Sequence, residues 1–163
     1  MKFCLFVVLW LLAAAYPVEA WAYERFPAFE VKAAGIVGKQ VEIRCHSQQE
    51  WESFPFHQEA HAVTWFGESG PQYISLSPRI CISLVWHFTL PWAHRWSYRP
   101  TRSEEALSLL VLYHEAFHMT GERDEGVTEC NAIRLLGKEQ SLEIYRLALL
   151  WHNRLPAAYR TVC

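Results

Sequence analysis

Two histidines four residues apart carry the strongest chemical signal in this sequence. Residues 114–118 read His-Glu-Ala-Phe-His, an HExxH pattern. On a helix, positions i and i+4 lie one turn apart on the same face, so His114 and His118 can both reach one Zn²⁺ ion at about 2.0–2.1 Å. Glu115 is then placed beside a metal-bound water and can act as its general base. The pattern predicts a zinc-dependent hydrolytic site.

A catalytic zinc site also needs a third protein ligand and an open fourth position. The carboxylates that follow the motif closely are Asp124, Glu125 and Glu129. If the chain reverses after the motif and a second helix packs antiparallel on the first, Glu125 lies near His118 and Glu129 near His114. We therefore predict Glu125 as the ligand and Glu129 as the acceptor that orients His114. Asp124 is explained as the N-cap of the second helix, and Asp124 and Glu129 stay as rival ligands.

The sequence around the motif predicts the helices that must position these side chains. Thr101 and Glu104 form a T-x-x-E capping box, and apolar residues then recur at helical spacing through the motif. Gly121 is placed to end this helix in a left-handed turn. A second helix is expected over residues 124–137 and a third over about 141–151.

The first half of the chain has a different character. Six prolines interrupt residues 27–100, and short β-like runs stand at 41–45, 63–66 and 73–76. We expect loops, a few short strands and one short helix there. The fold class is therefore α+β, with an irregular, short-strand N-terminal half and a helical C-terminal half, in a single domain over residues 21–163.

The N-terminus predicts export. Lys2 is followed by an apolar run over residues 3–15, a proline and small residues, the pattern of a secretory signal peptide over residues 1–20. The run is too short to span a bilayer, so we expect a secreted protein without a membrane partner after signal cleavage. The formal net charge of −2 gives no basic face for nucleic acid.

The cysteines predict disulfides. The chain after the signal keeps Cys45, Cys81, Cys130 and Cys163, and no two of them form a CxxC-like pair. In an exported protein of this size, this favours two disulfides over a cysteine zinc site. The residues alone leave all three pairings open.

The segment HEAFHMTGERDEGVTEC resembles zincin metallopeptidases of the gluzincin type. In that family a helix bearing the ligand glutamate follows HExxH, and an acidic residue four positions later contacts the first histidine. The resemblance implies a minimal zincin-like fold with Glu125 as ligand and Glu129 against His114. The departure is the gap between the helices, which is shorter here than gluzincins usually have.

The same segment, together with YISLSPRIC and LPAAYRTVC, also resembles small exported bacterial proteins with an HExxHxxGxxDE…EC run. This likeness covers most of residues 41–163 and supports the metal site and the fold more than peptidase activity. It also implies one pairing of the cysteines, Cys81 with Cys130 and Cys45 with Cys163.

Together these patterns predict a secreted, disulfide-stabilised zinc hydrolase, most simply a metallopeptidase that acts on a peptide or protein substrate. A zinc-binding exported module without catalysis is the alternative, and a structural protein without metal is the third reading. An oxyanion stabiliser is also needed. The sequence offers Tyr113, Tyr145, Tyr159 and Arg123 without choosing among them, and it assigns no role to the isolated His152.

Overall fold

The computed structural model describes residues 25–58, 60–89 and 98–156, and within them it contains both helices and a small mixed sheet. The α+β class is therefore confirmed. The elements in chain order are α2 (Pro27–Val37), β1 (Glu42–Cys45), α3 (Gln48–Ser53), β2 (Ala62–Gly67), β3 (Gly70–Leu76), α4 (Pro78–Thr89), α5 (Arg102–His118), α6 (Glu125–Glu139) and α7 (Leu142–His152).

The sheet has the strand order β1-β3-β2, in which β3 runs parallel to β1 and antiparallel to β2. Side chains alternate across each strand, and those on one face are buried, among them Ile43, Ile74 and Leu76. Thr64 of β2 lies in register with Ile74 and is also buried. A polar side chain therefore points from an edge strand into the apolar interior, where it needs a hydrogen-bond partner.

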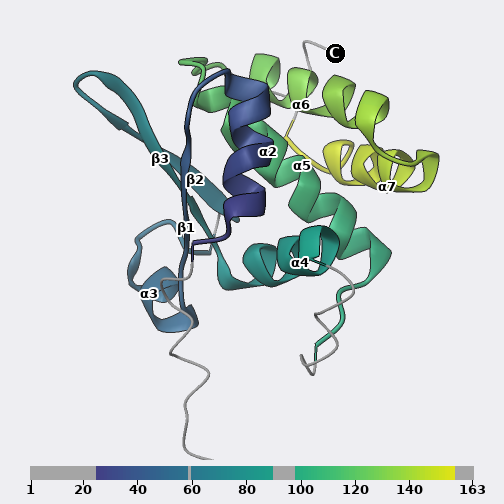
Figure 1. The fold of residues 1–163 in the computed structure, drawn as a ribbon. Coiled ribbons are helices and arrows are strands. Elements are labelled where there is room, and N and C mark those ends of the chain that lie inside the picture. Colours follow the sequence, from purple (N-terminus) through teal and green to yellow (C-terminus); the bar gives the residue numbers. More distant parts are fainter. Residues whose placement is uncertain (1–24, 59, 90–97, 157–163) are drawn as a thin grey trace, which may run out of the picture.

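Helix α5 is the centre of the packing. It contacts α2, α4, α6 and α7 as well as β2 and β3. Figure 1 shows α5 crossing the molecule, with α6 and α7 on one side and the sheet and its hairpin on the other. The side chains of Leu109, Leu112 and Ala116 are fully buried. Packing against these elements holds the C-terminal turn of α5, which carries the HExxH residues, in a fixed place.

The predicted strands and C-terminal helices agree with the structure, whereas the prediction for the first half of the chain was wrong in one respect. That half contains helices α2, α3 and α4, where a single short helix was expected. Pro27 and Pro78 are the first residues of α2 and α4. Proline is well accepted there, since the first helical N–H has no intrahelical partner. Prolines interpreted as breaks thus mark helix starts.

A disulfide joins Cys45, at the end of β1, to Cys81 in the first turn of α4. The pairing of Cys81 with Cys130 that the resemblance implied is therefore wrong, and so is that of Cys45 with Cys163. Strand β3 lies between the two half-cystines in sequence and leads directly into α4, so the sheet register brings α4 back to the end of β1. Cys130 is disulfide-bonded too, and Cys163 lies outside the described residues.

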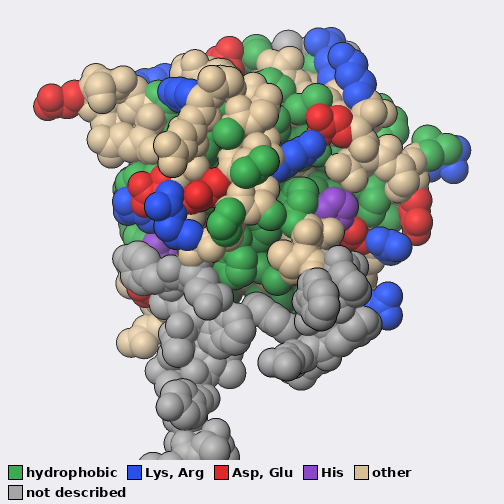
Figure 2. Space-filling model, in the orientation of Figure 1, with side chains coloured by type: hydrophobic (Ala, Val, Ile, Leu, Met, Phe, Trp, Pro, Cys, Tyr) green, Lys and Arg blue, Asp and Glu red, His purple; other side chains and the backbone are tan. Residues whose placement is uncertain are grey.

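The predicted signal peptide also lies outside the described residues. Among the helices that are described, none combines the length and the apolar character needed to cross a membrane. Figure 2 shows hydrophobic side chains near the middle of one face, with acidic and basic side chains of both signs distributed around them.

Candidate metal centre

Two helix ends meet at the candidate site. The capping box predicted at Thr101 and Glu104 is present and starts α5, and the helix ends at His118. Gly121 follows with φ of 101°, the left-handed conformation that glycine accepts at low cost. The chain then reverses, and α6 packs beside α5 (Figure 1). The side-chain oxygen of Asp124 accepts from Val127 N, so the predicted N-cap is confirmed.

Three predicted ligands converge at this corner. The Nε2 atoms of His114 and His118 lie 3.0 Å apart. Glu125 Oε2 lies 3.0 Å from His114 Nε2 and 3.4 Å from His118 Nε2. Within the described part of the chain, these residues make up the group of donors that could hold a metal ion. The antiparallel arrangement inferred from the sequence therefore brings Glu125 to both histidines.

The other ring nitrogens of the two histidines are hydrogen-bonded away from this centre. His114 Nδ1 donates to Glu129 Oε2 at 2.9 Å, and His118 Nδ1 donates to the backbone oxygen of Glu122 at 2.8 Å. With each Nδ1 hydrogen-bonded outward, each Nε2 faces the common centre and, once deprotonated, can offer its lone pair to a metal ion there. This outer hydrogen bonding fixes tautomer and ring orientation, as it does for histidines that bind metals.

Electrostatics favour a cation at the centre. Burial opposes the charged form of His114, but hydrogen bonds to Glu125 and Glu129 outweigh burial and raise the His114 pKa to about 10. Hydrogen bonds from His114 and His118 lower the pKa of Glu125 to about 2. The carboxylates thus hold a proton on the imidazole when no other cation is present. A metal ion that binds here must displace that proton.

Glu115, the predicted general base, lies between the two histidines in the sequence and is buried. Its carboxylate accepts a hydrogen bond of 2.7 Å from Thr64 Oγ1, which also lies 3.1 Å from the Glu115 backbone oxygen. Burial raises the pKa of Glu115, although His114 and the hydroxyl of Thr64 counteract it. The inward-facing threonine of β2 therefore has its partner, and a strand remote in sequence orients this carboxylate.

A buried contact that sequence reasoning missed lies behind His114. His152, near the end of α7, donates from Nδ1 to Glu129 Oε1 at 3.1 Å. Both side chains are buried, with 6% of His152 and 2% of Glu129 exposed. Glu129 therefore accepts one N–H at each oxygen, one from His114 and one from His152. The one sequence signal was the position of His152 at the end of an amphipathic helix, which does not indicate its partner.

The structure separates the candidates for an oxyanion stabiliser. The hydroxyl of Tyr113 is engaged with Glu139, and the ring of Tyr145 packs against Gly137. Tyr159 lies outside the described residues. Arg123 is in the loop between α5 and α6, and its guanidinium lies 4.7 Å from the centre of the Phe66 ring. Of the described candidates, Arg123 is thus the one beside the cluster.

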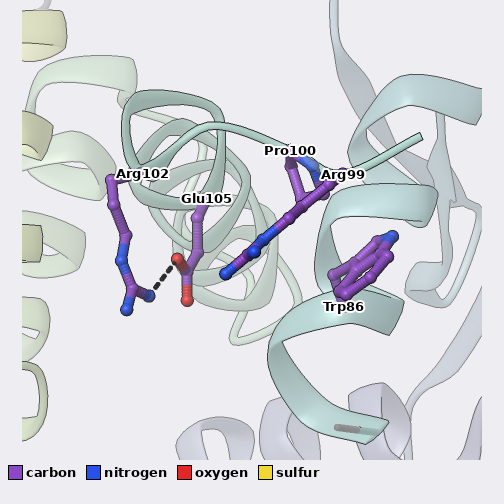
Figure 3. Close-up of a pocket in the computed structure, with 5 residues that line it drawn as sticks. All are labelled: Trp86, Arg99, Pro100, Arg102 and Glu105. Atoms are coloured by element: carbon purple, nitrogen blue, oxygen red, sulfur yellow. Dashed lines mark hydrogen bonds and ion pairs between the residues drawn. The ribbon is translucent and has the colours of Figure 1, made fainter. Parts of the chain in front are cut away.

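A pocket formed by described residues lies at the other end of α5. Trp86, Arg99, Pro100, Arg102 and Glu105 line it, and Figure 3 shows Arg102 paired with Glu105. The residues that line this pocket do not form a group of metal donors, so the pocket and the candidate metal ligands are separate sites. We place the candidate site at the metal cluster because donor convergence is the more specific signal.

Comparisons of the chain with protein-family models, with curated protein sequences and with solved structures each gave no match.

Proposed function

We propose that this protein is a secreted zinc-dependent hydrolase, most simply a metallopeptidase. The observation that carries the proposal is the convergence of His114 Nε2, His118 Nε2 and Glu125 Oε2 within 3.0–3.4 Å of one another. Two imidazoles and a carboxylate on HExxH spacing are a donor set that catalytic zinc sites use.

The distances support a tetrahedral ion of zinc size. Ligands about 2.0–2.1 Å from a tetrahedral centre are about 3.3–3.4 Å apart. The separations of 3.0–3.4 Å between the three donor atoms are close to this, so a small adjustment would admit the ion. The side chain of Glu125 is 46% exposed, whereas those of His114 and His118 are 12% and 8% exposed. The cluster is therefore reached from the Glu125 side, where a fourth position would face solvent.

Residues of this chain then have separate roles in the proposed hydrolysis. His114, His118 and Glu125 would hold a Zn²⁺ ion, which would supply Lewis-acid activation of water and of a substrate carbonyl group. Glu115 accepts the proton that the attacking water loses and returns it to the leaving amine. Thr64 holds the carboxylate of Glu115 in one orientation through its hydroxyl. Glu129 keeps the proton of His114 on Nδ1 and so keeps Nε2 free for the metal.

The test combines metal content with turnover on the signal-free, oxidised protein. We expect about one zinc per chain, lost in His114→Ala and retained in His57→Ala. His57 is a suitable control because its Nδ1 bonds to the backbone of Phe54, outside the cluster. We also expect the parent to cleave members of a peptide library, and Glu115→Gln to bind zinc without cleaving them.

Each outcome has a definite meaning. Absence of zinc after reconstitution would overturn the proposal. Undiminished cleavage by Glu115→Gln would overturn the assignment of the general base. Stoichiometric zinc without cleavage of any peptide by the parent would favour the alternative, a zinc-binding module in which the metal serves folding.

A further inference from the structure

Phe66 and Arg123 form a small surface next to the candidate metal ligands, which we call the Phe66–Arg123 shelf. Phe66 lies near the end of β2, and its ring meets the ring of His118 edge-on, with 6.3 Å between centroids. The guanidinium of Arg123 lies over the same ring, 4.7 Å from its centre. Because β2 and the α5–α6 loop both reach the cluster, the shelf joins two segments that are remote in sequence.

Among the described residues, no carboxylate pairs with the positive charge of the shelf. Within residues 25–58, 60–89 and 98–156, the guanidinium of Arg123 forms no ion pair, and its contact there is the Phe66 ring. The neighbouring carboxylates are used by the backbone: Glu122 accepts from two loop N–H groups, and Asp124 caps α6. The side chain of Arg123 is exposed, so its N–H donors face solvent.

The shelf also carries exposed apolar area. Phe66 is 37% exposed, although it is a large aromatic residue beside a polar cluster. An arginine stacked on an aromatic ring keeps its plane fixed and offers its edge as a two-pronged donor, which matches the geometry of a carboxylate. Lysine would not offer this fork. The combination therefore suits an anionic group attached to a short apolar chain.

We infer that the Phe66–Arg123 shelf binds a carboxylate of the substrate, so that the site prefers peptides with a negative charge close to the bond that is cut. This inference rests on the proposed function. The carboxylates of Glu115, Glu125 and Glu129 surround the cluster, and a divalent ion there offsets part of their charge. Arg123 then supplies the attraction that selects an anionic substrate.

Binding of metal-directed probes tests this without requiring turnover. The probes are monohydroxamates of succinic, glutaric and adipic acid, each compared with its carboxamide analogue by calorimetry on the zinc-loaded protein. In at least one pair we expect the acid to bind about tenfold more tightly than the amide, the size of one charge-assisted contact at an accessible site. Arg123→Gln should abolish the difference, and Arg123→Lys should restore only part of it.

Arg154→Gln is the matched control, because the guanidinium of Arg154 is also stacked on an aromatic ring, that of Trp151. It should keep the full preference for the acid. The two hydroxamates of glutamic acid, with the free carboxylate at either end, then distinguish a side-chain carboxylate from a C-terminal one.

The outcomes separate this inference from the proposed function. If the protein binds no zinc, the proposed function fails and the inference fails with it. If zinc and hydroxamates bind but acid and amide bind equally, only the inference is overturned. It is overturned as well if Arg123→Gln keeps the preference.

Discussion

Glu129→Gln tests the hydrogen bonding behind the metal cluster. The carboxylate of Glu129 accepts from His114 at one oxygen and from His152 at the other, at 2.9 and 3.1 Å. Glutamine has the same shape but only one oxygen, so its amide N–H₂ group must face one of the two N–H donors. Because the site is buried, water cannot replace the lost acceptor. An unpaired buried donor costs about 1–3 kcal/mol.

The metal responds as well, because of the tautomer of His114. If the amide nitrogen faces His114, the ring can regain a hydrogen bond only by moving its proton from Nδ1 to Nε2, the atom that would bind the metal. Loss of such an outer partner typically lowers metal affinity by about 10–100-fold. We therefore expect Glu129→Gln to lower the free energy of unfolding by about 1–3 kcal/mol and zinc affinity by about 10–100-fold.

The assay is a competitive zinc titration against a chelator, beside denaturant unfolding of the metal-free protein. Glu143→Gln, an exposed glutamate on α7, makes the same chemical change away from the cluster and should alter neither quantity. The reasoning is refuted if Glu129→Gln binds zinc within about twofold of the parent while His114→Ala loses it.

Three further predictions concern the metal ligands, the disulfide and the loss of stability at low pH. Asp124→Ser keeps a cap for α6 but removes the carboxylate, so zinc affinity should stay within about twofold of the parent in the same titration; a larger loss would make Asp124 a ligand. Replacing both Cys45 and Cys81 by alanine opens a loop with a sequence separation of 36 and should cost about 4 kcal/mol in denaturant unfolding; an unchanged midpoint would contradict this. Hydrogen bonds, chiefly from the hydroxyl of Tyr98 and the backbone of Thr101, lower the pKa of Glu104 from 4.5 to about 2. Its contribution to stability is therefore present above about pH 4.5 and is lost as the pH falls through about 2. The difference in unfolding free energy between the parent and Glu104→Gln should therefore shrink over that range, and a constant difference would argue against it.

The C-terminal half was predictable because its signals are local. A capping box at Thr101, a glycine at 121 and caps at Asp124 and Ser141 each act within one turn of the residues that they order. Because the loop between α5 and α6 is short, the two helices pack antiparallel. That constraint, together with the spacing of two histidines, was enough to place Glu125 at the candidate metal ligands.

The tertiary structure alone decided the contacts between segments that are distant in sequence. Thr64 meets Glu115 because the sheet register turns one edge residue inward, and His152 meets Glu129 because α7 packs against both α5 and α6. The disulfide of Cys45 follows from the same sheet register. Such contacts depend on how whole elements pack against one another. The periodicity or the cap of a single helix or strand does not indicate that packing. The sequence therefore determined which residues could bind a metal, and packing decided which side chains hold them in place.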